Sequence, residues 1–153
     1  MNDPRRRPWA LAAALCAFVV GLDPAAKALV EAELVAGEQV DVLGPLSLTL
    51  THNRGIAFGL ADGGGVVLIA LTVAALVFVG VLFARDPARR GMWIAVGLLV
   101  GGALGNLVDR VRAGEVTDYI DVLSWPPFNL ADVAITIGVV VLALSYLGDA
   151  EPG

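Results

Sequence analysis

The segment "VVLIALTVAALVFVGVLFARDPARRGMWIAVGLLVGGALGNLV", residues Val66 to Val108, consists of two long apolar runs separated by a short arginine-rich stretch. The runs Val66 to Ala84 and Met92 to Val108 each approach the roughly 20 apolar residues that an α-helix needs to cross a bilayer. Because the backbone must satisfy its own hydrogen bonds in lipid, each run is predicted to be a helix. This segment therefore indicates an all-α membrane protein.

Two further apolar stretches, Trp9 to Val30 and Leu130 to Leu147, complete a predicted set of four transmembrane helices. The 153-residue chain is 58% hydrophobic and 16% charged, whereas soluble proteins contain about 25% charged residues. The mean hydropathy is +0.79. We expect a single integral-membrane domain over residues 1–153, with larger outer loops at 31–65 and 109–128.

The first apolar stretch also has features of a signal sequence, because Arg5, Arg6 and Arg7 precede it and Cys16 lies within it. Leu15, directly before the cysteine, is too large for the small-residue position at which such sequences are cleaved. Since three more apolar stretches follow, we interpret the first as a retained span.

The arginines predict the orientation of the chain in the membrane. One group precedes the first span and another lies between the second and third spans, whereas the other two connections carry more acids than arginines. Short loops rich in arginine face the cytoplasm, so both termini are expected there and the two larger loops outside. The net charge of −5 is a sum over both faces, and it does not indicate nucleic-acid binding.

The first outer loop contains a predicted β-hairpin. "LSLTLT", from Leu46 to Thr51, alternates apolar and polar residues as a half-buried strand does, and "VDV" before Gly44 and Pro45 provides a partner. We expect a small β-sheet platform on the outer membrane surface. A short amphipathic segment, Ile56 to Leu60, and several glycines then lead into the second span.

The third span combines a packing stripe with a polar end. Gly97, Gly101 and Gly105 recur every four residues, which allows a second helix to approach closely. At the outer end, polar residues at i, i+3 and i+4 share one helix face: Asn106, Asp109 and Arg110. Asp109 and Arg110 would also be explained as a solvated ion pair at the end of a helix.

Two aspartates, Asp118 and Asp132, flank the start of the fourth span and lie on the same side of the membrane. Asp132 has a structural explanation, because "NLAD" places Asn129 as an N-cap and Asp132 three residues later, where a carboxylate favours the helix dipole. A carboxylate at membrane depth is nevertheless a candidate functional group. Two carboxylates in a poorly hydrated site do not both ionise easily, so together they provide an acid and a base for peptide hydrolysis.

Other hydrolytic chemistries fit the sequence less well. There is no HExxH motif, and no serine lies in a recognisable nucleophile motif. The single cysteine excludes an internal disulfide, and the single histidine leaves no cluster of zinc ligands. We expect no metal and no cofactor.

Four ordered segments resemble the lipoprotein signal peptidases (signal peptidase II) of bacteria. They are "DPAAK" from Asp23, "NRGIAFGL" from Asn53, "GNLVDRVRAGEVTDYID" from Gly105, and "FNLADVAI" from Phe128. Each alone is weak, but four in this order on a four-span chain are specific. Ala26 departs from the family, which usually has Ser or Thr there, so no hydroxyl role is expected at that position.

The resemblance implies an aspartic endopeptidase of the bacterial cytoplasmic (inner) membrane, with its site near the extracytoplasmic face. Its substrates would be diacylglyceryl-modified prolipoproteins, cut before the lipidated cysteine, and its inhibitors would be of the globomycin type. The residue roles that it implies are as follows: Asp118 and Asp132 catalytic; Asn53, Asn106, Arg110 and Asn129 lining the substrate or inhibitor site; Asp23 and Lys27 structural. We add Asp109 and Gly55 as structural support.

Two other functions remain open from the sequence. In a transporter or proton-relay protein, the intramembrane Asp and Asn residues would form a relay. The acids gather at one interface and no repeat is evident, which argues against this alternative. In a membrane scaffold, "NLAD" would be only a helix cap and "LVDR" only a surface ion pair.

Overall fold

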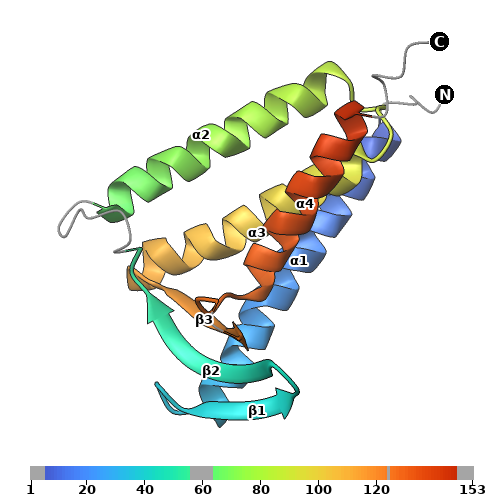
Figure 1. The fold of residues 1–153 in the computed structure, drawn as a ribbon. Coiled ribbons are helices and arrows are strands. Elements are labelled where there is room, and N and C mark those ends of the chain that lie inside the picture. The colour runs from blue at the N-terminus through green and yellow to red at the C-terminus, as the bar shows by residue number, and fades with distance from the viewer. Residues whose placement is uncertain (1–5, 56–63, 124, 148–153) are drawn as a thin grey trace.

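Four long helices form the body of the protein in the computed structural model, which describes residues 6–55, 64–123 and 125–147 (Figure 1). All four are long and apolar enough to cross a membrane. Their bounds are α1 Arg6–Glu33, α2 Gly64–Arg85, α3 Met92–Ala113 and α4 Leu130–Leu147. The predicted fold class, four membrane-spanning helices with a small sheet, is therefore confirmed.

The helix α3 lies at the centre of the bundle, between α1 and α4. A methyl group added at Gly101 would lie 2.8 Å from Cβ of Val19 on α1, and one added at Gly97 would lie 2.9 Å from Cβ of Leu15. The glycine stripe thus allows α1 and α3 to pack backbone against backbone, as predicted.

The helix α2 is attached less closely than the other three, and its main neighbour is α3. At its end, Phe83 is fully buried with Met92, and the ring of Trp9 on α1 lies 4.4 Å from that of Phe83, measured between centroids. The apolar core at this end of the bundle therefore holds α2 against α1 and α3.

A three-stranded antiparallel sheet lies at the opposite end of the bundle (Figure 1). The strands are β1 Gln39–Leu43, β2 Leu46–Asn53 and β3 Val116–Val122, in the order β1-β2-β3. The predicted hairpin is present as β1 and β2. The expected outer loop 109–128 contains a third strand that was not predicted, β3, which pairs with β2 in the register Thr51↔Asp118 and Asn53↔Val116.

The third helix also continues to Ala113, beyond the predicted span end at Val108. Gly114 ends it, with a φ of 76° and its N–H bonded to the Arg110 carbonyl at 3.1 Å. A glycine adopts this left-handed conformation without strain. The chain can therefore turn sharply from α3 into β3, which carries Asp118.

The two groups of arginines that predict the orientation lie at the opposite end of the molecule from the sheet. Arg6 begins α1, Arg85 ends α2, and Arg89 and Arg90 lie in the connection to α3. These elements meet at the end of the bundle away from the sheet (Figure 1). The predicted amphipathic segment Ile56 to Leu60 lies outside the described residues.

Candidate active site

Asp118 and Asp132 approach each other because the chain folds back immediately after β3. The Phe128 N–H donates to the Ile120 carbonyl at 3.0 Å, and the Ile120 N–H donates to the Phe128 carbonyl at 2.8 Å. This bridge places the start of α4 beside the middle of β3. As a result, Asp132 in the first turn of α4 lies near Asp118 on the strand.

The side chain of Asn129 joins the two aspartates. It is fully buried, and its Nδ2 donates to Oδ1 of Asp118 at 2.7 Å. Its Oδ1 accepts the backbone N–H of Asp132 at 3.0 Å, and its own N–H donates to Oδ2 of Asp132 at 3.4 Å. The predicted N-cap is therefore present, and the same residue binds the other carboxylate.

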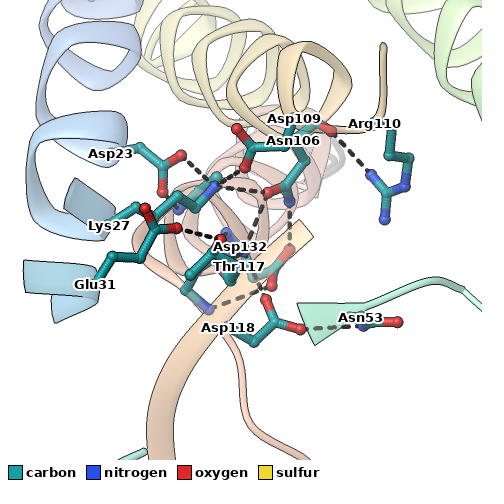
Figure 2. Close-up of polar contacts among 12 residues, drawn as sticks. Asp23, Lys27, Glu31, Asn53, Asn106, Asp109, Arg110, Thr117, Asp118 and Asp132 are labelled. Atoms are coloured by element: carbon teal, nitrogen blue, oxygen red, sulfur yellow. Dashed lines mark hydrogen bonds and ion pairs between the residues drawn. The ribbon is translucent and has the colours of Figure 1, made fainter. Parts of the chain in front are cut away.

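Two further amides bind the outer sides of the aspartates (Figure 2). Asn106 on α3 donates from Nδ2 to Oδ1 of Asp132 at 2.8 Å. Asn53 at the end of β2 donates from Nδ2 to Oδ2 of Asp118 at 3.0 Å, while its Oδ1 accepts the Gly55 N–H at 2.8 Å. Both carboxylates are thus held on both oxygens by N–H donors.

A buried ion-pair network lies behind the aspartates. Lys27 Nζ lies 2.6 Å from Oδ2 of Asp23 and 2.5 Å from Oδ2 of Asp109, and it also donates to Oδ1 of Asn106 at 3.3 Å. The other oxygen of Asp23 accepts the Ala131 N–H at 3.0 Å. This network links α1 to α3 and to the first turn of α4.

The surroundings of Asp118 raise its pKa. Asp118 is only 3% exposed, and this burial raises the pKa of its carboxyl above the ordinary value of 3.8. The charge of Asp132 raises the pKa further, while hydrogen bonds from Asn53 and Asn129 and the charge of Lys27 oppose the rise. Burial and a second carboxylate are the conditions under which an acidic pair retains one proton.

Asp132 lines two hollows, one on each side of the first turn of α4. The first is a cavity of about 290 Å³ between α2, α3 and α4, with mainly apolar walls. The second has a volume of about 460 Å³. The first is lined by Thr72, Ala75, Leu76, Val79, Leu99, Ala103, Asn106, Arg110, Asp132 and Ile135, and the second by Trp125, Phe128, Asp132, Val133, Thr136 and Ile137.

The structure gathers the predicted site residues around the two aspartates, with different degrees of access. Asn106 and Asn129 are buried and their amides bind other site residues. Arg110 lines the first cavity and donates to the Asn106 carbonyl at 3.3 Å. Its guanidinium lies to one side of the aspartate pair, next to that carbonyl (Figure 2). Asp109 forms its ion pair with Lys27 and not with Arg110, the partner that the sequence had left open.

Three residues at the site were missed by the sequence reasoning. The Thr117 carbonyl also accepts from Asn129 Nδ2 at 3.3 Å, and the Thr117 hydroxyl donates to Glu31 at 2.7 Å. Thr51 donates to the Asp118 carbonyl at 3.2 Å. The sequence feature that could have revealed them is the group of β-branched residues around Asp118, which indicates a strand that needs a partner.

Within the described ranges, no group of three or more His, Cys, Asp or Glu side chains could hold a metal ion.

The arrangement provides two carboxylates that are joined through Asn129: Asp118, whose pKa is raised, and Asp132, which lines a mainly apolar cavity. Such a pair can take a proton from water and give one to a carbonyl oxygen. Hydrolysis of an amide bond within an apolar substrate is the chemistry that these groups can support.

Comparison with known proteins identifies relatives over most of the chain. Residues 15–148 match the family described as "Signal peptidase (SPase) II". The chain is 38% identical to a lipoprotein signal peptidase of Halothermothrix orenii, with 88% of this chain and 92% of that protein covered. It is 43% identical to a lipoprotein signal peptidase of Brucella ovis, with 86% of each covered.

Solved structures agree with this result. A bacterial membrane enzyme determined by the in meso method at 1.9 Å resolution has a TM-score of 0.83 and 32% identity, with 91% of this chain and 94% of that chain covered. A second, at 2.3 Å resolution, has a TM-score of 0.82 and covers 92% of this chain and 89% of that chain. This chain is a multi-pass membrane peptidase, and it belongs to the signal peptidase II family.

Proposed function

We propose that this protein is an aspartic endopeptidase in which Asp118 and Asp132 are the catalytic pair. The observation that carries the proposal is the junction at Asn129, whose side chain binds Oδ1 of Asp118 at 2.7 Å and the backbone N–H of Asp132 at 3.0 Å. It sets the two carboxylates in one fixed arrangement. An acid and a base must be held in such an arrangement to act on the same bond.

In the proposed reaction, the pair holds one proton. The ionised carboxylate takes a proton from water as the water oxygen attacks the scissile carbonyl carbon, and the protonated carboxyl donates to the carbonyl oxygen. The C–N bond of the resulting tetrahedral intermediate then breaks as the carboxyl that took the water proton donates it to the leaving nitrogen, while a hydroxyl of the intermediate gives its proton to the other carboxylate. The pair returns to its initial protonation state, and no covalent enzyme intermediate forms.

We propose that the substrates are diacylglyceryl-modified prolipoproteins, cut just before the lipidated cysteine. The relatives named lipoprotein signal peptidases support this substrate class. The mainly apolar cavity beside Asp132 also suits a substrate that arrives from lipid. A site between α2, α3 and α4 would accept the end of a membrane helix laterally.

We propose the bacterial cytoplasmic (inner) membrane as the location, with both termini in the cytoplasm and the site near the outer face. The arginines at the end of the bundle opposite the sheet support this orientation. Globomycin-type cyclic peptides are the expected inhibitors. The carboxylate pair supplies both proton transfers, so we expect cleavage to continue in the presence of a chelator.

The test is cleavage of a diacylglyceryl-modified prolipoprotein by purified wild-type protein, Asp118→Asn and Asp132→Asn. Asparagine keeps the shape of the side chain but removes its proton chemistry. We expect each variant to cleave at least about 100-fold more slowly, as for loss of a general acid or base. Asp121→Asn is the matched control, because Asp121 lies on the same strand and contacts Gln39 at 3.5 Å instead of the pair.

Binding of globomycin by each variant, measured as protection against heat, shows that the variant is folded. A folded Asp118→Asn or Asp132→Asn variant that cleaves at near the wild-type rate would contradict the aspartic mechanism. Loss of activity in a chelator that is restored by a metal would contradict the metal-free reaction.

A further inference from the structure

Lys27 is buried behind the carboxylate pair and reaches three side chains on two helices. It is 4% exposed, and its ammonium bonds to Asp23, Asp109 and Asn106 (Figure 2). It contacts neither catalytic candidate directly. Two carboxylates are sufficient to neutralise one ammonium, so the third contact, to the Asn106 amide, is not required for charge balance.

The contact with Lys27 constrains which end of the Asn106 amide faces Asp132. An asparagine side chain has one end that accepts hydrogen bonds and one that donates them, whereas an ammonium only donates. Oδ1 of Asn106 accepts from Lys27 at 3.3 Å and from Asn129 Nδ2 at 3.1 Å. Its Nδ2 is thereby directed at Oδ1 of Asp132, at 2.8 Å.

The reversed amide would be unfavourable at both ends. Its Nδ2, a donor, would face the ammonium of Lys27, which is also a donor. Its Oδ1, an acceptor, would face the Asp132 carboxylate, which is also an acceptor. Without Lys27, Asn129 would fix the Asn106 amide less firmly, because Asn129 Nδ2 also donates to Asp118 and to the Thr117 carbonyl.

Lys27 is itself held in place from both sides. Asp23 lies one turn earlier on α1 and also caps α4 through the Ala131 N–H. Asp109 lies on α3, close to Asn106 in sequence. The ammonium therefore occupies a fixed point relative to both the α3 amide and the first turn of α4.

We propose that Lys27 is a positioning residue that acts through Asn106. It sets the amide so that Nδ2 donates to Asp132, and this donor holds the carboxylate in its orientation toward the reacting bond. The inference rests on the proposed role of Asp132. It assigns Lys27 a part in turnover that is separate from its part in joining the helices.

The test measures the effect of Asn106→Ala in two backgrounds, using the lipid-modified prolipoprotein as substrate. In the wild type we expect Asn106→Ala to lower kcat about 10- to 100-fold, as for misplacement of a reacting group, with KM changed less than about twofold. In the background Asp23→Asn/Lys27→Met, which itself has lowered kcat, the same change should lower kcat less than about threefold. Replacing Asp23 as well avoids leaving its carboxylate buried without a counter-charge.

The control background is Asp109→Asn, which removes one partner of Lys27 and leaves the contact between Lys27 and Asn106. There Asn106→Ala should keep its full effect on kcat. A purely structural role of Lys27 predicts instead that the effects of the two changes multiply in the Lys27→Met background. That result, or a kcat for Asp23→Asn/Lys27→Met equal to the wild-type value, would overturn the inference.

Asp132→Asn is assayed in the same series to separate this inference from the proposed function. If Asp132→Asn cleaves normally, the aspartic mechanism itself fails. If Asp132→Asn is inactive while Asn106→Ala has the same effect in every background, only the role of Lys27 fails.

Discussion

Asn129 and Asp132 hydrogen-bond each other twice, through Asp132 N–H to Asn129 Oδ1 at 3.0 Å and Asn129 N–H to Asp132 Oδ2 at 3.4 Å. This is the reciprocal arrangement of a capping box at a helix N-terminus. Asp132 also accepts from Asn106 and lines two hollows. Asp132 is therefore part of both the helix cap and the candidate active site.

Replacing Asn129 should separate these two roles. Asn129→Ala removes the cap and the donor to Asp118, so we expect the free energy of unfolding to fall by about 1–3 kcal/mol and kcat to fall about 100-fold. Asn129→Ser retains a good capping oxygen but is too short to reach Asp118. It should recover most of the stability and little of the activity, measured by thermal unfolding in detergent and by cleavage. Equal recovery of both would show that the side chain acts only as a cap.

The pH dependence of cleavage should respond to Asn53. Its N–H donor stabilises the ionised form of Asp118 and so opposes the rise in pKa caused by burial. In Asn53→Ala the pKa of Asp118 therefore rises further, and the pH range of activity moves upward.

The measurement for Asn53→Ala is kcat/KM against pH. Arg54→Ala is the control, because Arg54 is the next residue and its exposed side chain pairs with Glu115. Its profile should match that of the wild type. A downward shift in Asn53→Ala would contradict the assigned role of the amide.

Glycine substitutions should distinguish the packed face of α3 from a position on α2 that has open space beside it. In Gly101→Ala the new methyl group meets Val19 Cβ at 2.8 Å and the Cys16 carbonyl oxygen at 3.1 Å, so the helices must move apart. We expect a loss of about 1–3 kcal/mol in stability, seen as a lower Tm. In Gly80→Ala the methyl group meets nothing within 4 Å, so Tm should stay the same or rise. Equal Tm values for the two variants would show that the stripe does not set the packing of α1 on α3.

The helices and the hairpin could be predicted from the sequence because their signals are local. An apolar run of membrane length predicts a span, and the alternation in Leu46 to Thr51 predicts a strand. The strand β3 was missed because it is defined by pairing with β2, far away in sequence. The strand itself contains Asp118 and Asp121, and aspartate is unfavourable in strands. These two residues weakened the strand prediction that the β-branched residues around them would otherwise give.

Which residues lie together at the site, and the cap at Asn129, could also be predicted, but most of the side-chain hydrogen bonds between different helices and strands could not. Asp23, Lys27, Asn106, Asp109 and Asn129 all lie near the pair, as expected from four ordered motifs. One explanation left open by the sequence paired Asp109 with Arg110, whereas the fold provides Lys27 from another helix as the partner of Asp109. Spacing along one helix gives no information about which neighbouring helix faces it, so the amide directions also had to come from the structure.

The position of Asp132 on α4 has a consequence for the biogenesis of the protein. α4 is the last of the described helices to be synthesised, and it contributes both Asp132 and the contact of Ala131 with Asp23, while Asn129 lies just before it. A chain still emerging from the ribosome, with α1 to α3 already inserted, holds Asp118 but does not yet have Asp132 beside it. The proposed catalytic pair is complete only when α4 enters the membrane, so on the proposed mechanism nascent copies of this protein would be inactive during insertion.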